Sequence, residues 1–285
     1  MVEHTSPGEP ARRFWLCADD YGIAPGVNAA IRDLVARGRL NATSVMVVAP
    51  TFLQVAASML ATLNSAGKRV AIGLHITLTG PLTPKTPDYR PVADGEFLPL
   101  GAMLRVAMQQ RLDMGALTRE IEAQFAAFTA AFGRPPDFVD GHQHVHLFPQ
   151  VRQAVLDTAR RLAPQAWVRQ CGSNLPVQRR LADPKGMLID WLSREFRARA
   201  DRFGVATNPA FAGTYTYRPN ADFERIFPTF LEGLPAGGLI MCHPGFVDAE
   251  LERLDPLTTL REREYAYFCS DRFPEDLKAH GLTLD

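Results

Sequence analysis

Residues 14–38 read FWLCADDYGIAPGVNAAIRDLVARG, and they set the class of fold that the sequence predicts. Their apolar start, Phe14–Ala18, is typical of a buried strand, and a turn that contains glycine and proline follows. Apolar residues then recur at helical spacing, at Val27, Ile31, Leu34 and Val35. Gly38 is suited to end this helix, because glycine readily adopts the left-handed conformation found after many helices. The stretch therefore predicts a strand followed by a helix.

The same alternation of short apolar runs and longer amphipathic stretches continues along the chain. Further strands are expected at 44–48, 70–75, 138–140, 167–169 and 238–242, with a short strand at the C-terminal end. Further helices are expected at 52–63, 117–132, 151–162, 187–202, 223–234, 261–268 and 274–280. Residues 80–100 and 171–185 lack a clear period and are expected to be long loops beside a site. Such alternation favours an α/β fold with a mostly parallel sheet or barrel.

Composition limits the number of domains and the class of partner. The 285 residues are compatible with one domain, which we place at 14–285 after a flexible tail at 1–13. Thirty-one basic residues balance 31 acidic ones, so the positive charge that nucleic acid requires is missing. No apolar run reaches the ~20 residues that span a bilayer, and no signal peptide is visible, so we expect a cytoplasmic protein without a transmembrane segment. The four cysteines lack metal or redox spacing and are expected to be free thiols.

Side chains that can bind metal follow several of the predicted strands. They are Asp19, Asp20, His75, His142, His144, His146 and His243. Because the C-terminal ends of parallel strands meet on one face, residues distant in sequence become neighbours there. Taken singly, the Asp pair has a common alternative as a turn or helix cap, and His75 as a hydrogen-bonded core residue. Their recurrence on independent strands favours a functional site.

The run Asp140–His146, DGHQHVH, carries the sharpest signal. Three histidines at alternate positions are costly to bury without a metal or an acidic partner. One carboxylate and two imidazoles would leave positions open for water and substrate, as metal-assisted hydrolysis requires. Imidazoles favour Zn, Fe, Co or Ni, whereas a mixed oxygen and nitrogen shell also admits Mg or Mn.

These motifs resemble those of the YdjC/ChbG-like carbohydrate deacetylases, a family that includes chitooligosaccharide deacetylase and the hopanoid-associated HpnK branch. The resemblance covers about residues 14–285 and rests on ADDYG with PGVN, GLH, DGHQHVH and CHP, in this order. It implies an irregular or incomplete (β/α) TIM-like barrel related to the NodB polysaccharide deacetylases. It also implies hydrolysis of the acetyl group of an N-acetylated sugar, either chitooligosaccharide-like or glycolipid-linked N-acetylglucosamine.

The resemblance also assigns roles to individual residues. One divalent metal ion, with Mg or Zn favoured, would be held by Asp20, His75 and His142. Asp19 would be the general base and His243 the general acid or oxyanion-stabilising group, while Arg169 would orient Asp19. Further residues would orient a ligand, contact the substrate or pack near the site, namely His144, His146, Tyr21 and Asn28. Tyr21 stands where the family more often carries Phe, and family members often form homodimers.

Two other functions remain open from the sequence alone. A metal-binding protein without hydrolytic activity would keep the ligands but would need neither Asp19 nor His243. A metal-dependent phosphoesterase on a related barrel commonly uses two metal ions, whereas ligands for only one are apparent here.

Overall fold

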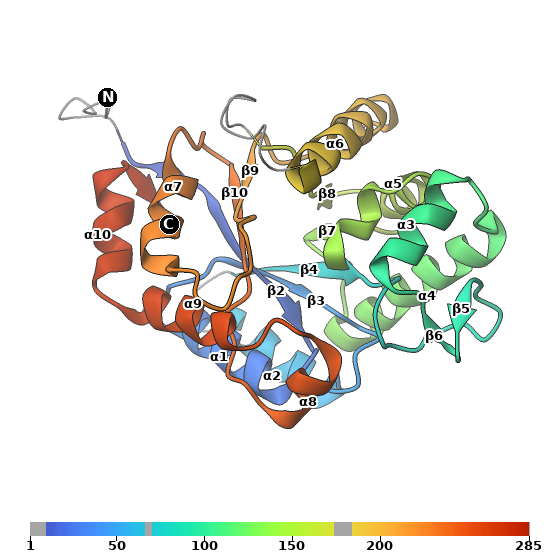
Figure 1. Ribbon diagram of the computed structural model, residues 1–285, viewed down its shortest axis with the longest axis horizontal. Helices are drawn as coiled ribbons and strands as arrows, with labels where there is room; N and C mark the ends of the chain where they lie inside the picture. The colour runs from blue at the N-terminus through green and yellow to red at the C-terminus, as the bar shows by residue number, and fades with distance from the viewer. Residues whose placement is uncertain (1–9, 66–69, 174–183, 285) are drawn as a thin grey trace.

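A seven-stranded parallel sheet forms the centre of the molecule (Figure 1). The computed structural model describes residues 10–65, 70–173 and 184–284. The strands are β2 (Trp15–Tyr21), β3 (Ala42–Val45), β4 (Ala71–Ile76), β7 (Phe138–Gly141), β8 (Trp167–Val168), β9 (Phe211–Ala212) and β10 (Leu239–Cys242), in the order β8-β7-β4-β3-β2-β10-β9. Every neighbouring pair is parallel.

Isolated bridges connect the two edges of this sheet. Ser173, which follows edge strand β8, pairs with Phe211 of the opposite edge strand β9, and Val168 pairs with Thr207. The sheet therefore curls into an incomplete (β/α) barrel, which confirms the predicted fold class.

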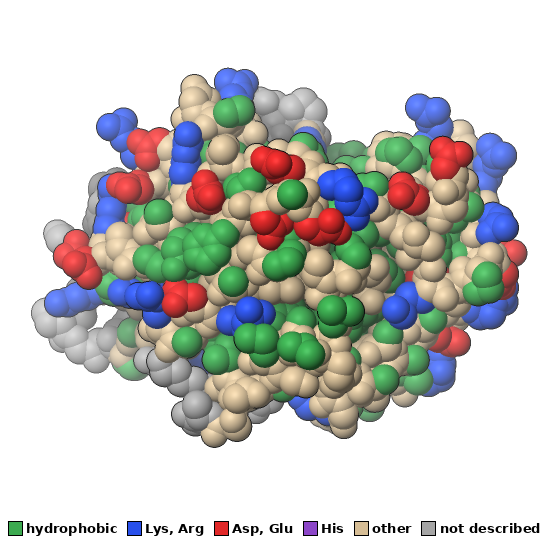
Figure 2. Space-filling model, turned by 90° about the horizontal axis from the view of Figure 1, so that it is seen from below, with side chains coloured by type: hydrophobic (Ala, Val, Ile, Leu, Met, Phe, Trp, Pro, Cys, Tyr) green, Lys and Arg blue, Asp and Glu red, His purple; other side chains and the backbone are tan. Residues whose placement is uncertain are grey.

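Helices surround the barrel (Figure 1). They are α1 (Pro25–Ala36), α2 (Gln54–Ser65), α3 (Leu100–Met108), α4 (Met114–Phe132), α5 (Val151–Leu162), α6 (Pro184–Phe203), α7 (Phe223–Leu231), α8 (Ala249–Leu254), α9 (Thr259–Cys269) and α10 (Arg272–Ala279). Within the described ranges, no helix combines the length and the apolar character needed to cross a membrane. Figure 2 shows one face on which basic and acidic side chains are interspersed, in keeping with the balanced charge of the chain.

Helix α4 shows how the sequence sets these elements. The Asp113 carboxylate caps the helix by accepting hydrogen bonds from the backbone N–H groups of Gly115 and Ala116. Gly133 ends it in the left-handed conformation, with φ of 68°. The apolar stripe predicted from the sequence is buried as core at Leu117, Ile121, Phe125 and Phe128, and Phe132 packs against it partly buried.

The sequence missed several short elements and misplaced some boundaries. Strand β9 and the antiparallel pair β5 (Val92–Ala93) and β6 (Glu96–Phe97) have two residues each, too few to show a period. Helices α3 and α8 were also not predicted, and β3 begins at Ala42 rather than at residue 44. Residues 12–13 lie in the expected tail but form β1 (Arg12–Arg13), which pairs with β11 (Leu282–Thr283). Most of the expected loop at 171–185 lies outside the described residues.

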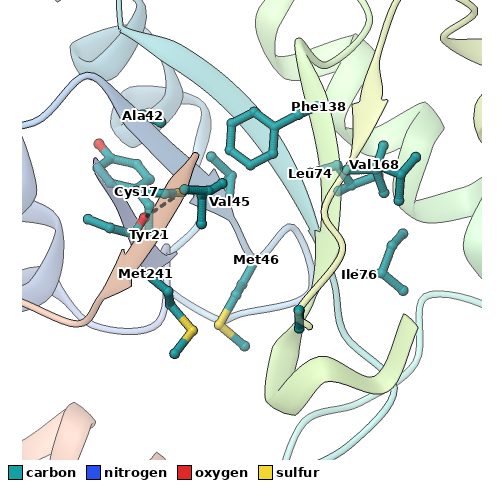
Figure 3. Packing of buried hydrophobic residues seen from close by; sticks show 14 of the residues in the cluster. Cys17, Tyr21, Ala42, Val45, Met46, Leu74, Ile76, Phe138, Val168 and Met241 are labelled. Carbon is teal, nitrogen blue, oxygen red and sulfur yellow. Dashed lines mark hydrogen bonds between the residues drawn. The ribbon is translucent and has the colours of Figure 1, made fainter. Parts of the chain in front are cut away.

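Inward-facing side chains fill the barrel in layers, because successive residues of a strand point to opposite faces. At the amino-terminal end of the strands, the rings of Phe138 and Trp167 stack with centroids 4.5 Å apart. The side chain of Phe138 lies among the buried residues drawn in Figure 3. A Cβ atom at Gly73 would lie 2.4 Å from the Phe138 ring, so β4 accommodates this ring only because residue 73 is glycine.

We predict that Gly73→Ala lowers the free energy of unfolding by about 1–3 kcal/mol, because the added methyl group overpacks the Phe138 ring. Gly101→Ala is the matched control, since a Cβ atom there has no heavy atom within 4 Å. The control lies in α3 and should leave the stability unchanged or raise it by up to about 1 kcal/mol. Urea denaturation of both variants measures the effect, and equal stabilities would contradict the packing described here.

Candidate metal and catalytic site

A cavity of about 410 Å³ opens at the carboxyl ends of the barrel strands. Its polar wall includes Asp19 and Asp20 of β2, His75 of β4, and His142 and His243, which directly follow β7 and β10. Its apolar wall is formed by Leu100, Leu104, Leu147, Phe148, Leu188, Ile189, Leu192, Met241, Pro256 and Leu257. The cavity therefore joins a compact group of titratable side chains to an apolar surface.

Asp20, His75 and His142 lie together in this cavity. One ligand atom from each lies within 4.8 Å of the others. Asp20 Oδ1 is 3.3 Å from His75 Nε2 and 3.1 Å from His142 Nδ1. Ligand atoms of a tetrahedral zinc ion, with bonds of about 2.0–2.1 Å, lie about 3.3 Å apart. The donor set and its spacing therefore fit a divalent metal ion.

Asp140 holds the imidazole of His75 in place. Asp140 Oδ1 lies 2.7 Å from His75 Nδ1, and Ser44 Oγ lies 3.0 Å from the same nitrogen. Burial opposes the charge on His75, but Asp140 and then Asp20 outweigh it and raise the pKa of His75 to about 10. Without metal, an imidazolium donates to both carboxylates. When Nδ1–H donates to Asp140, the lone pair of Nε2 is available to a metal ion.

Asp20 owes its position to an irregularity in β2. The pairing of β2 with β3 shifts between Ala18 and Tyr21, and Asp20 has a φ of 69°, in the left-handed region. This extra residue lets adjacent aspartates reach the same cavity, although adjacent residues of a regular strand face opposite sides. Asp20 Oδ2 also accepts a hydrogen bond of 2.7 Å from buried Arg261, which outweighs burial and lowers the pKa of Asp20.

Arg169 is fully buried and pairs with two carboxylates. Its Nη1 and Nη2 atoms lie 2.6 Å from the two oxygens of Asp19, and Nη2 lies 2.6 Å from Asp140 Oδ2. The same nitrogen contacts Cys17 Sγ at 3.0 Å. Burial alone would raise the pKa of Asp19, but the guanidinium holds it well below its ordinary value. Asp19 is thus an ionised carboxylate at neutral pH.

His243 faces the cavity from the end of β10. Its backbone N–H donates to Glu264 Oε2 at 2.5 Å, and Glu264 Oε1 accepts a hydrogen bond of 2.7 Å from the Tyr215 hydroxyl. Glu264 is fully buried, and burial raises its pKa. In the part of the chain that the structure describes, His243 Nδ1 has no hydrogen-bond partner, so the ring is free to bond a ligand.

The histidines of the DGHQHVH run do not share one strand edge. The strand ends at Gly141, and His142–Leu147 form a 3-10 turn (η1) in which Gln143 and His144 have positive φ. Because of this turn, the imidazole rings of His142, His144 and His146 point in different directions.

His144 and His146 occupy separate environments. His144 lines the cavity, with Nδ1 3.5 Å from Cys171 Sγ. His146 is fully buried under the turn, and its Nε2 lies 2.8 Å from the Arg169 carbonyl oxygen. Burial lowers the pKa of His146 to about 3, so its imidazole is neutral and donates this hydrogen bond. The sequence left open which ring would pack under the turn, and the structure places His146 there.

Tyr21 and Asn28 lie away from the cavity. The Tyr21 hydroxyl donates to the Ala56 carbonyl oxygen at 2.7 Å and accepts from Arg32, which corrects the expectation of a hydroxyl near the site. Asn28 Oδ1 accepts a hydrogen bond from Gly22 N at 2.6 Å and so fixes the turn after β2. Both side chains stabilise the β2–α1 unit.

Sequence reasoning did not find three buried groups that complete the site. Asp140 stood inside a quoted motif, and its place two residues before His142 was a usable signal. Arg261 and Glu264 lie in α9, whose charged residues look like an ordinary solvated helix face. Nothing in their spacing indicated that both side chains are fully buried.

Comparison with known proteins places the chain among relatives of similar length. Residues 13–279 match the family model described as YdjC-like protein. Relatives named chitooligosaccharide deacetylase in Yersinia pestis (strain Pestoides F) and Yersinia pseudotuberculosis serotype O:1b (strain IP 31758) are each 30% identical over 243 residues, or 82% of this chain and 82% of the relative. The crystal structure of a candidate cellobiose-phosphate cleavage protein from Enterococcus faecalis V583 has the same fold. It superposes with a TM-score of 0.74 at 22% identity, covering 96% of this chain and 97% of that chain.

We predict that His146 makes the protein sensitive to mild acid. Its pKa is about 3 in the folded state and 6.5 ordinarily, so stability is full above pH 6.5 and is lost as the pH falls toward 3. The pKa of His75 is shifted in the opposite direction, to about 10, so the contribution of His75 to stability stays complete below pH 6.5. When the pH falls from 6.5 to 5, the free energy of unfolding should therefore decrease in both proteins. The decrease should be about 1–2 kcal/mol smaller in His146→Gln than in the parent.

Urea denaturation at several pH values, in metal-free buffer, measures these slopes. His280→Gln, at the C-terminal end of α10, controls for the substitution itself. Identical pH slopes for the parent and His146→Gln would show that His146 is not the buried neutral group described here.

Proposed function

The chain belongs to the YdjC-like protein family, and on this premise we propose that it hydrolyses the N-acetyl group of an N-acetylated sugar and releases acetate. The observation that carries the proposal is the grouping, in one cavity, of a three-donor metal site, an ionised carboxylate and a histidine with an unpartnered ring nitrogen. Hydrolysis of an amide requires activation of water, polarisation of the carbonyl and protonation of the leaving amine.

Asp20, His75 and His142 are the proposed ligands of one divalent ion, with Mg and Zn as the favoured metals. A bound ion would supply Lewis acidity, which polarises the acyl carbonyl and lowers the pKa of water. Three protein ligands leave positions free for water and substrate. The support lies in the donor set, in its spacing and in the hydrogen bond by which Asp140 orients His75.

Asp19 is the proposed general base. Its carboxylate is ionised and lines the cavity, and the residue lies in β2 directly before Asp20. Arg169 donates hydrogen bonds to both oxygens of Asp19 and so positions the carboxylate. It also makes Asp19 a weak base, because it lowers the pKa of this carboxyl group. A weak base suffices where the attacking water is already acidified.

His243 is the proposed general acid. As water attacks, Asp19 accepts a proton from it and the carbonyl carbon becomes tetrahedral; the C–N bond then breaks, and a ring N–H of His243 gives its proton to the departing amine. The products are acetate and a free amino sugar. Glu264 fixes the backbone amide of His243 and so contributes to the position of the ring.

The position of Arg169 argues against a two-metal phosphoesterase. Cys17, Asp19 and Asp140 form a second group of potential ligands within 4.8 Å of one another. The Arg169 guanidinium contacts all three side chains. A cation of the protein itself thus occupies the second group of potential metal ligands found in the described ranges.

Acetylated saccharides suit the mixed character of the cavity. Leucines of α3 and α6 line it beside the polar centre, and such a surface accepts the apolar face of a sugar ring or an apolar group attached to the sugar. We therefore retain both chitooligosaccharide-like and glycolipid-linked N-acetylglucosamine as substrates. The cytoplasmic location and the homodimer expected from the sequence stay predictions.

We predict that the base and the ligands are separable by mutation. Asp19→Asn should retain the metal content of the parent and lose at least about 10²-fold in kcat, because only the proton acceptor is removed. His75→Ala and His142→Ala should lose the metal itself. Metal content and acetate release from N-acetylglucosamine oligosaccharides measure the two effects. Asp33→Asn and His280→Ala, at positions outside the cavity lining, are the matched controls. Full activity of Asp19→Asn would refute its assignment as base.

We also predict that a chelator abolishes acetate release and that re-added Zn²⁺ or Mg²⁺ restores it, because the three ligands would hold an ion that supplies Lewis acidity to the reaction. The assay should contain acetylated oligosaccharides, an acetylated glycolipid and a phosphorylated acetylated disaccharide. Release of phosphate without acetate would instead identify a phosphoesterase. Stoichiometric metal binding without either product would identify a non-catalytic metal protein.

A further inference from the structure

Tyr217 lies in the cavity although no sequence motif pointed to it. It belongs to the segment between β9 and α7 and lines the same cavity as Asp19, Asp20 and His243. The side chain is half-buried, and its hydroxyl forms no hydrogen bond with any residue in the described parts of the chain. Because Tyr217 lines the cavity, this unbonded hydroxyl is available to a ligand.

Neighbouring side chains hold the ring of Tyr217 in place. It packs against the Tyr215 ring with centroids 4.4 Å apart and meets the His243 imidazole edge-on at 5.9 Å. The Tyr215 hydroxyl donates to the same buried Glu264 carboxylate that receives the His243 N–H. Glu264 therefore ties the Tyr217 segment and the end of β10 to one anchor.

The backbone of this segment lies directly against β10. Gly213 has a φ of 107°, and a Cβ atom there would lie 2.1 Å from the Met241 carbonyl oxygen. Only glycine permits so close an approach. The approach fixes the start of a segment from which Thr214 and Tyr217 line the cavity.

The charge around Tyr217 keeps its hydroxyl protonated. Burial raises the pKa of Tyr217, and the negative charges of Glu264 and Asp19 raise it further. A phenol in this setting acts as a hydrogen-bond donor at neutral pH. Tyr217 lines the same cavity as Asp19, and its ring meets the His243 imidazole, so the donor lies near the proposed catalytic groups.

We propose that Tyr217 is a further catalytic residue of the proposed deacetylation, donating a hydrogen bond to the acyl oxygen as negative charge develops there. The assignment rests on the proposed function. Donors aimed at a developing oxyanion act mainly in the transition state, so their loss lowers kcat more than it raises KM.

The test is Tyr217→Phe, which keeps the ring that packs against Tyr215 and His243 and removes only the hydroxyl. With N-acetylglucosamine oligosaccharides, kcat should fall about 10²-fold while KM changes by less than about threefold. Metal content and thermal stability should match those of the parent. Tyr265→Phe is the matched control, because it removes a hydroxyl that bonds Asp33 outside the cavity lining, and it should keep the kcat of the parent.

The outcomes separate this assignment from the proposed function. If the parent releases no acetate from any acetylated sugar, the proposed function fails and this role for Tyr217 fails with it. If the parent is active and Tyr217→Phe keeps its kcat, only this assignment is overturned. A rise in KM alone would place the hydroxyl at a distant sugar, and loss of metal would make its effect indirect, so either result also overturns it.

Discussion

The pairing of buried charges is the constraint on which the site depends. Asp19, Asp140 and Arg169 are almost completely removed from water, and an unpaired charge there would be strongly destabilising. Arg169 forms ion pairs with both carboxylates at 2.6 Å only when β2, β7 and β8 hold their observed register. A shift of one residue in any of these strands would turn its charged side chain to the other face. The same interaction thus links correct strand pairing to the geometry of the cavity.

Layering of the barrel interior connects this charge network to its neighbours. Below it, Phe138 and Trp167 fill the barrel with stacked rings. At the same level, His75 is the strand partner of Asp140; its Nδ1 lies 2.7 Å from Asp140 Oδ1 and its Nε2 lies 3.3 Å from Asp20 Oδ1. The polar layer therefore rests on an apolar layer and carries side chains of the proposed site. The irregular backbone at Asp20 is tolerated because Arg261 and both imidazoles hold its carboxylate.

The sequence predicted the features that a local pattern can encode. The strands that carry Asp19 and His75, the strand that precedes His243, and the helices with clear apolar stripes were found because period and burial determine them together. The placement of metal-binding residues at strand ends followed from the geometry of parallel sheets. Tyr21 was misjudged because its side chain turns toward α2 at a bulge that the sequence does not reveal. The sequence did not identify Arg261, Glu264 or Tyr217, because their positions depend on long-range contacts. It also could not distinguish His144 from His146, because their different environments result from positive φ angles at the turn.

Helix α9 contributes both Arg261, which binds Asp20, and Glu264, which anchors His243. These two residues follow Asp20 by more than 200 positions. During translation, the proposed metal ligands are therefore synthesised well before the two residues of α9 that hold Asp20 and His243 in place. During translation, the emerging barrel would carry an aspartate whose partner has not yet been made. The complete centre can therefore form only after α9 has been synthesised and has packed against the barrel.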